Sequence, residues 1–322
     1  MLSTYLTQRW GLDVPLVGAP MTPAAGGRLA AAISTSGALG MIGVSSTQPV
    51  EQIERDVAEY RAIANDRPFG IGLMTWATDA RPELLDAALR ARPFVVAMSF
   101  GDPAKYVPKI RDAGARVVAQ VQDHKSALAA EAAGVEVIVA QGTEAGGHTG
   151  GVATLTLLQI VLEAVKVPVI AAGGVASGRG LAAVLAAGAA GGWIGTPFLA
   201  AEEARNSAAA RRQVIAAKET DTVHTHVFDV AQGIPWPDAY PGRALANAFT
   251  AAWHGREGEL ARDDAAKREF QSAKQAEDYA KTVLYAGQAV GLVDRVEPAA
   301  AIVRRIADGA EAILRDVGAI VR

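Results

Sequence analysis

The chain has 322 residues, of which 50% are hydrophobic and 20% charged, and this composition excludes a disordered or fibrous protein. Its 31 Lys and Arg residues nearly balance its 34 Asp and Glu residues, so the net charge of −3 offers no electrostatic attraction to nucleic acid or to an acidic membrane surface. Because the chain has no cysteine, disulfides, thiolate metal sites and cysteine nucleophiles are excluded. Residues 1–15 lack the basic end and apolar stretch of a signal peptide, so we expect a soluble, cytoplasmic enzyme or binding protein.

Eight short apolar runs recur along the first two thirds of the chain and predict strands. They cover residues 14–20, 39–44, 69–74, 94–100, 116–121, 135–142, 167–174 and 191–198. Alanine-rich stretches between them predict helices over 50–65, 81–91, 125–133 and 178–187. Nearly continuous apolar strands that alternate with helices indicate parallel strands buried on both faces. Eight such units favour an α/β fold of the (β/α)8 TIM-barrel type over an open sheet.

One uncharged stretch of 22 residues, 180–201, resembles a membrane span in hydropathy alone. It contains five glycines and Pro197, and it divides into an alanine-rich half and a half that reads GGWIGTPF. This composition fits a buried helix followed by a buried strand better than a spanning helix. We therefore expect no membrane association.

The composition changes after the eighth predicted strand. Residues 256–281 carry 13 charged side chains in 26 positions, which is typical of a solvated helix. The segment 233–243 is a proline-punctuated loop. We therefore predict a barrel formed by residues 1–201 and 282–322, with a helical insertion or cap over 202–281. An amphipathic helix over 298–317 would complete the barrel.

The reactive groups of such a barrel lie at the carboxyl ends of its strands. The sixth strand runs into the loop 141–151, which holds five glycines around Glu144 and His148. The seventh and eighth strands end in Gly173-Gly174 and Gly195-Thr196, and backbone amides at these two ends commonly bind phosphate. A single glycine pair is better explained by a tight turn, but the two ends and the glycine-rich loop together favour phosphate binding. Gln120 either reaches a ligand or satisfies a neighbouring backbone group.

Among the five histidines, His148 is the acid or base candidate, because it lies at a strand end inside the glycine-rich loop. His124 is expected at a helix start on the surface, and His254 at a helix end. His224 and His226 form an H-x-H pair without an accompanying carboxylate cluster, so we expect a solvated strand or loop rather than a metal site. Since the chain has no thiol, a redox reaction would need a cofactor.

The segment Gln141–Gly150, QGTEAGGHTG, resembles the signature of the nitronate monooxygenase family. Other matching pieces follow the same order along nearly the whole chain: GAPM at 18–21, LG at 39–40, FG at 69–70, AAGGV at 171–175, IGT at 194–196 and YAGQ at 285–288. FMN-dependent enoyl reductases and quinone reductases share part of this signature.

The resemblance implies a TIM barrel that binds FMN without a covalent bond. The flavin would lie against residues of four strand ends, and its phosphate side against the seventh and eighth strands; the implied contacts are Ala19, Pro20, Met21, Gly72, Gln120, Gln141, Gly146, Gly147, Gly173, Gly174, Trp193, Ile194, Gly195 and Thr196. His148 would face the substrate as its base or hydrogen-bond donor. The implied reaction is oxidation of an alkyl nitronate by O2 to a carbonyl compound and nitrite.

The sequence departs from the family pattern at three positions. Gly72 replaces an asparagine, and Pro197 and Thr149 replace arginines. These changes weaken the substrate assignment more than the cofactor assignment. Two alternatives therefore stay open: an FMN-dependent NAD(P)H reductase of enoyl thioesters or quinones, and a flavin-binding protein without catalysis. The sequence leaves the physiological substrate and the oligomeric state open, with a homodimer as one option.

Overall fold

The computed structural model describes residues 2–317, so residue 1 and the end of the predicted barrel segment, 318–322, lie outside the described residues. Eight parallel strands, one in each predicted run, pair in the order β1-β9-β8-β6-β5-β4-β3-β2. A parallel bridge between Val17 and Leu39 joins the two ends of this order. The fold is therefore a (β/α)8 TIM barrel, as predicted. Its strands are β1 Leu16–Gly18, β2 Gly40–Gly43, β3 Phe69–Met74, β4 Val95–Ser99, β5 Arg116–Val121, β6 Val137–Gln141, β8 Val169–Ala172 and β9 Gly191–Ile194.

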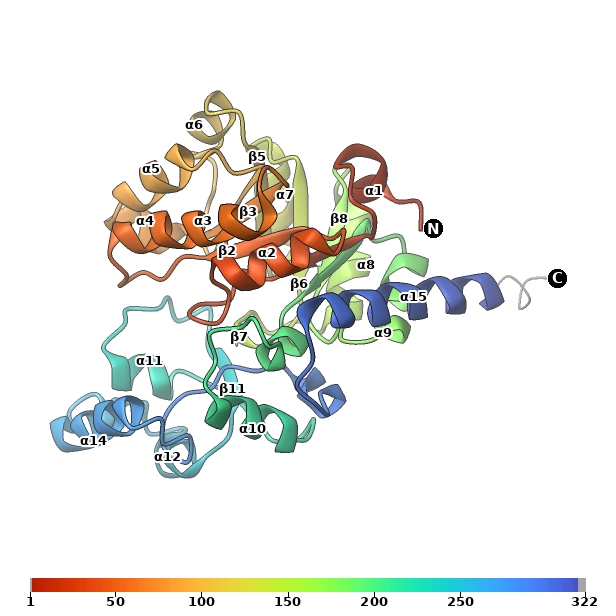
Figure 1. The fold of residues 1–322 in the computed structure, drawn as a ribbon. Coiled ribbons are helices and arrows are strands. Elements are labelled where there is room, and N and C mark those ends of the chain that lie inside the picture. Colours follow the sequence, from red (N-terminus) through yellow and green to blue (C-terminus); the bar gives the residue numbers. More distant parts are fainter. Residues whose placement is uncertain (1, 318–322) are drawn as a thin grey trace.

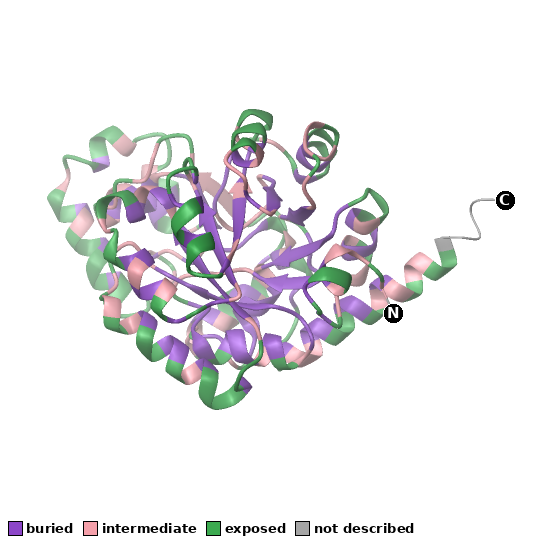
Figure 2. Cartoon of the chain, turned by 90° about the horizontal axis from the view of Figure 1, so that it is seen from above, coloured by how far each residue is buried: buried purple, intermediate pink, exposed green. Residues whose placement is uncertain are grey.

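Helices surround the strands and turn their apolar faces inward (Figure 1, Figure 2). In α3 the buried residues Ile53, Val57 and Tyr60 recur at a spacing of three or four, which places them on one helical face. The uncharged stretch 180–201 forms most of α9 and then β9, which confirms the predicted helix and strand. The strand is shorter than predicted, because Thr196–Ala200 form a 3-10 helix instead. The barrel helices are α1 Tyr5–Arg9, α2 Gly27–Thr35, α3 Val50–Ala64, α4 Thr75–Ala80, α5 Glu83–Arg90, α6 Val107–Asp112, α7 His124–Ala132, α8 Thr154–Ala164, α9 Gly178–Ala186 and α15 Ala299–Val317. Within residues 2–317 no helix has both the length and the apolar character needed to cross a membrane.

The barrel interior is filled by apolar side chains. Along β6, Val137 and Val139 point into the barrel, whereas Ile138 and Ala140 pack against the surrounding helices. The inner layer also includes Val17, Val118, Ile170 and Trp193. A filled interior leaves only the ends of the strands for chemistry. Gln141 follows Val139 in the inward series, so it lies at the carboxyl end of this packed core.

The segment after β9 gathers at one end of the barrel, away from α1 (Figure 1). It contains η1 Thr196–Ala200, α10 Ala208–Ala216, β10 Thr222–Thr225, α11 Val227–Gln232, β11 Gly242–Leu245, α12 Ala248–Trp253, α13 Glu257–Leu260 and α14 Asp264–Gln275, and η2 Gln288–Leu292 follows it. Besides the expected helices it therefore contains two strands. These strands pair with β7, Gly147–His148, in the order β10-β11-β7. The glycine-rich loop and the insertion consequently share one small sheet.

Gly27 lies where α2 and α3 approach too closely for a side chain. A Cβ there would lie 1.9 Å from the Asp56 carbonyl oxygen and 2.8 Å from the Tyr60 backbone nitrogen. Because both are backbone atoms, we expect Gly27→Ala to lower the free energy of unfolding by about 1–3 kcal/mol. Gly258 in α13 has no atom within 4 Å of its Cβ position, so Gly258→Ala should raise that free energy by about 0.5–1 kcal/mol. Denaturant unfolding measures both changes, and equal stability of the two variants would contradict this account of the helix contact.

Candidate functional site

Three glutamine side chains meet at the carboxyl end of the barrel. Oε1 of Gln141 accepts hydrogen bonds from Nε2 of Gln120 at 3.0 Å and from Nε2 of Gln122 at 2.9 Å. The structure thus brings together the predicted residues Gln120 and Gln141, and the Gln120 amide is bound by a side chain rather than by neighbouring backbone. Oε1 of Gln141 receives both bonds, and no acceptor within residues 2–317 is hydrogen-bonded to its Nε2 group, which is left to donate to a ligand. Sequence reasoning missed Gln122, although its spacing of two from Gln120 places both on the same side.

The glycine-rich loop is held on both sides by tight contacts. Glu144 Oε2 accepts a hydrogen bond from the Thr154 backbone amide at 2.6 Å and a second one from the Thr154 hydroxyl, so this carboxylate caps α8. A Cβ on Gly146 would lie 2.5 Å from the Gly287 nitrogen, which explains the glycine there. Arg243 of β11 donates through Nε to the Thr143 carbonyl oxygen at 2.7 Å. Glu144 and Arg243 therefore fix the loop's shape.

The ends of β8 and β9 form a cradle of backbone amides. The two strands are neighbours, with Ala172 opposite Trp193. Gly173 and Gly174 have φ values of +101° and +71°, which favour glycine. Among residues 2–317, no acceptor is hydrogen-bonded to the amides of Gly174, Val175, Gly195 or Thr196. Unpaired amides on two adjacent strand ends, followed by the start of α9, are the donor set that a phosphate monoester requires.

The segment after β1 lies across this end of the barrel. At Gly195, a Cβ would lie 3.2 Å from Sδ of Met21 and 3.5 Å from Cβ of Ala19. At Gly72, a Cβ would lie 2.3 Å from Cγ of Pro20. The structure thus brings together residues that were predicted to contact the flavin from the ends of the first, third and eighth strands. In this chain a side chain at position 72, such as the family's asparagine, would overlap Pro20.

Restoring the family asparagine should therefore harm this protein. We expect Gly72→Asn to lower the free energy of unfolding by about 1–3 kcal/mol, because Pro20 occupies the space the side chain needs. Adding Pro20→Ala should recover most of that loss by removing the ring atoms. Thermal unfolding of the single and double variants measures both effects. A stable Gly72→Asn protein, or a double variant no better than the single one, would contradict the contact.

Two predicted flavin contacts have side chains that point away from the cradle. Trp193 is 4% exposed and belongs to the barrel interior, and Ile194 packs in the layer between strands and helices. Either residue could therefore meet a phosphate only through its backbone. The assignment of all fourteen flavin-contact residues stays a prediction.

His148 lies on β7 and is bound by the insertion. Its Nε2 is 2.9 Å from Oδ1 of Asp229, which α11 supplies, and the imidazole is only 6% exposed. The Trp236 ring stacks on the imidazole with centroids 3.4 Å apart and an interplanar angle of 8°. Burial lowers the pKa of His148 below its ordinary value of 6.5, although Asp229 opposes this shift. A neutral imidazole beside a carboxylate can act as a base near neutral pH.

Aromatic rings surround His148. Trp236 lies 5.0 Å from both Trp76 and Phe100, and Phe100 lies 5.3 Å from Tyr240, measured between ring centroids. The Tyr285 ring is 5.4 Å from the imidazole. Trp76, Phe100, Trp236 and Tyr240 therefore share one aromatic cluster next to the candidate base. This cluster offers an apolar substrate a contact surface.

Most of the remaining histidines have hydrogen-bonding partners. Nε2 of His224 lies 2.9 Å from both the Thr149 hydroxyl and the Pro241 carbonyl oxygen, and Nδ1 of His226 lies 3.1 Å from Oδ2 of Asp229. His224 lies on β10, in line with the expected strand, but both residues are only partly exposed rather than fully solvated. His124 begins α7 on the surface, and His254 follows the end of α12. Residues 2–317 hold no group of three His, Cys, Asp or Glu side chains suited to a metal ion.

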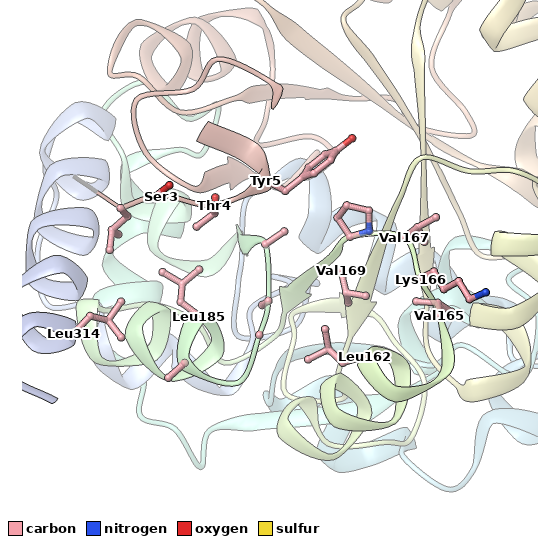
Figure 3. Close-up of a pocket in the computed structure, with 16 residues that line it drawn as sticks. Ser3, Thr4, Tyr5, Leu162, Val165, Lys166, Val167, Val169, Leu185 and Leu314 are labelled. Atoms are coloured by element: carbon pink, nitrogen blue, oxygen red, sulfur yellow. The ribbon is translucent and has the colours of Figure 1, made fainter. Parts of the chain in front are cut away.

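A depression of about 540 Å³ lies at the opposite end of the barrel. Figure 3 shows Tyr5, Leu162, Val169, Leu185 and Leu314 around it. Val169 is the first residue of β8, so this depression belongs to the amino-terminal face of the strands. That face of a TIM barrel serves stability rather than catalysis. We therefore place the candidate site at the glutamine cluster, the amide cradle and His148.

Comparison with known proteins identifies relatives of the whole chain. The family model for nitronate monooxygenase matches residues 83–309. A nitronate monooxygenase of Metarhizium robertsii, npaC, is 32% identical over 96% of this chain and 94% of its own length. The crystal structures of nitroalkane oxidase from Streptomyces ansochromogenes include a chain that is 28% identical, with a TM-score of 0.82 over 98% of this chain and 99% of that one.

Other relatives carry different names. A structure of FabK from Thermotoga maritima superposes over 100% of both chains with a TM-score of 0.87 and 29% identity. The (3aS,4S,5R,7aS)-5-hydroxy-7a-methyl-1-oxo-octahydro-1H-indene-4-carboxyl-CoA dehydrogenase of Rhodococcus jostii is 36% identical over 71% of this chain. That match spans 64% of the dehydrogenase's own length. The relatives thus share a fold and a sequence pattern while differing in the activities they are named for.

Proposed function

Because the chain belongs to the nitronate monooxygenase family of flavin-dependent oxidoreductases, we propose that it binds FMN and oxidises alkyl nitronates with O2 to carbonyl compounds and nitrite. The observation that carries this proposal is the neutral, buried His148. His148 is hydrogen-bonded to Asp229 and stacks against the Trp236 ring, at the end of the barrel that also holds the unpaired amides. The proposal thus joins a candidate base, an apolar contact surface and a phosphate cradle at one end of the barrel.

The residues present suit FMN. The amides of Gly174, Val175, Gly195 and Thr196 would hold its phosphate, and the free Nε2 group of Gln141 would donate to a flavin oxygen. Positive φ angles at Gly173 and Gly174 leave the cradle without side chains. When bound, FMN supplies the electron acceptor that a chain without cysteine lacks.

The chain's own groups would bind and orient the substrate. The aromatic cluster of Trp76, Phe100, Trp236 and Tyr240 would hold an alkyl chain and exclude water from His148. A neutral His148 can take an α-proton from a nitroalkane. The resulting imidazolium would then pair with the nitronate anion formed in this step.

A second function is favoured by specific relatives. The CoA dehydrogenase of Rhodococcus jostii is 36% identical to this chain, and the FabK structure superposes over its full length. These similarities support the alternative of an NAD(P)H-dependent reductase of enoyl thioesters or quinones. A flavin-binding protein without catalysis is the third candidate, and the pairing of His148 with Asp229 argues against it.

Product analysis in air tests the proposal. We expect the FMN-loaded protein to consume O2 and release nitrite and a carbonyl compound from propyl-2-nitronate, without any nicotinamide. Consumption of NADH or NADPH with an enoyl thioester or a quinone, and no nitrite from the nitronate, would instead support the reductase. Flavin binding without turnover of any of these substrates would support the non-catalytic candidate.

A further inference from the structure

Asp229 is a buried carboxylate shared by two imidazoles. Its Oδ1 lies 2.9 Å from Nε2 of His148, and its Oδ2 lies 3.1 Å from Nδ1 of His226. The Tyr285 hydroxyl is 3.4 Å from Oδ1, and Asp229 is only 4% exposed. A carboxylate at this depth is stable only when its oxygens accept hydrogen bonds. Each imidazole must therefore present an N–H group to Asp229.

This requirement fixes the proton positions on both rings. In a neutral His148 the proton lies on Nε2, so Nδ1 keeps its lone pair. Within the described chain, nothing is hydrogen-bonded to that Nδ1. His226 differs, because its Nε2 lies 3.1 Å from the Asp238 carbonyl oxygen while its Nδ1 faces Asp229. Its Nδ1–H therefore donates to the second oxygen of Asp229.

Burial and the neighbouring charges shift the pKa of His148 in opposite directions. Burial is the largest influence and lowers the pKa of His148 below 6.5, the Asp229 charge raises it, and His226 lowers it. The other titratable groups near the ring are Tyr285, whose own pKa burial raises well above 10.0, and His224 of β10. His148 is therefore kept neutral at pH 7 while its tautomer is fixed by an anion.

We propose that Asp229 is the positioning residue of His148, and that His226 tunes this base by binding the second oxygen of Asp229. In the step it supports, the α-proton of a neutral nitroalkane moves to Nδ1, and the C–H electron pair stays on the substrate as the nitronate. The imidazolium so formed keeps its Nε2–H on Asp229. This inference rests on the proposed function and deepens it, because it names the residues that position and tune the base.

Substitution of Asp229 should affect the two substrate forms unequally. Asp229→Asn keeps the size of the side chain but removes the charge that stabilises the imidazolium. We expect kcat/KM for nitroethane to fall by about 10²-fold or more. Preformed ethyl nitronate needs no proton removal, so its kcat/KM should fall by less than about 10-fold. Equal losses on both substrates would overturn the positioning role, because a merely structural defect affects both alike.

The pH dependence of the rate on nitroethane supplies a second test, in which each variant should shift the profile in a stated direction. For a neutral base, the rate on nitroethane falls as the pH drops through the pKa of His148, so this acid limb should lie below 6.5. His226 lowers the pKa of His148, and His226→Gln removes this influence while keeping a donor to Asp229, so the acid limb should move to higher pH. Asp229→Asn should move it down. Shifts in the same direction, or none, would overturn the proposal.

A control variant and a readout without turnover complete the test. His254 lies 3.8 Å from Glu257 at the same three-residue spacing but outside the aromatic cluster, so His254→Gln should leave both profiles unchanged. Histidine ring ¹⁵N NMR of the FMN-loaded protein at pH 7 should show the Nε2–H tautomer of His148 and a proton on Nδ1 of His226. An Nδ1–H tautomer of His148 would overturn the inference. The expected tautomers in a protein that turns over neither substrate would overturn the proposed function alone.

Discussion

His148→Gln is expected to lower kcat/KM for nitroethane by about 10²–10⁴-fold, because it removes the base that takes the α-proton. Glutamine keeps a polar side chain of similar size under Trp236, so the fold and the flavin content should be preserved. The loss on preformed ethyl nitronate should be smaller, since that substrate is already deprotonated. Steady-state kinetics on both substrates, with flavin content measured by absorbance, checks this expectation.

His224→Gln is the matched control for that experiment. His224 lies on the same small sheet and is partly buried, but it bonds to Thr149 and to the Pro241 carbonyl oxygen rather than to Asp229. Its substitution should change kcat/KM for nitroethane by less than about 10-fold. A His148→Gln enzyme with wild-type turnover of nitroethane would rule out His148 as the base.

Gly173→Ala is expected to abolish tight FMN binding. A Cβ at Gly173 would lie 2.7 Å from the Thr154 hydroxyl oxygen and 2.9 Å from the Gly142 carbonyl oxygen, and the φ of +101° disfavours any side chain. The end of β8 must then shift, and the amides of Gly174 and Val175 shift with it. We expect the Kd for FMN to rise by about 10²-fold or more, in line with the loss of two or more charge-assisted hydrogen bonds.

Gly188→Ala separates this effect from backbone strain. Gly188 has a φ of +106°, close to that of Gly173, but its Cβ position makes only ordinary contact with Leu162 at 3.6 Å. This glycine follows α9, at the opposite end of the helix from the cradle. Both variants should lose stability in thermal unfolding, whereas only Gly173→Ala should lose FMN affinity in a fluorescence titration. Equal FMN affinity in the two variants would contradict the cradle.

The barrel could be predicted from the sequence because its signal is local. Each strand is a short apolar run between turn residues, and each predicted helix boundary lies within two residues of the observed one. The interior-facing series Val137, Val139 and Gln141 follows from the alternation of side chains along a strand. Likewise, the amide cradle follows from glycines that end two strands, since neighbouring parallel strands end at the same edge.

The partners of His148 could not be predicted in the same way. Asp229 is 81 residues away in sequence, on a short helix of the insertion, and only folding brings the two together. A local signal was present, because Asp229 is one acid within an apolar run and follows His226 by three residues. The pairing of β11 with β7 is equally non-local, and two paired residues in β7 are too few to leave a pattern. Contacts between residues far apart in sequence therefore determine the structure of the site, and they produce little recognisable pattern in the local sequence.

The same distinction between the fold and the site applies to the chain's relatives. The barrel, the cradle and the imidazole suit more than one flavin reaction, and the chain's relatives carry the names of a monooxygenase and a CoA dehydrogenase. The proposal of an apolar nitro compound depends on the aromatic cluster, which combines Trp76 and Phe100 of the barrel with Trp236 and Tyr240 of the segment after β9. Function must therefore be tested at the site rather than read from the fold.

An anaerobic titration of the FMN-loaded protein tests the central claim most directly. Flavin absorbance is followed while propyl-2-nitronate is added, and then in separate samples while NADH or NADPH is added. The proposed function predicts loss of the oxidised flavin spectrum with the nitronate and no change with either nicotinamide. Rapid reduction by NADH or NADPH, with no response to the nitronate, would contradict it and place the enzyme among the reductases.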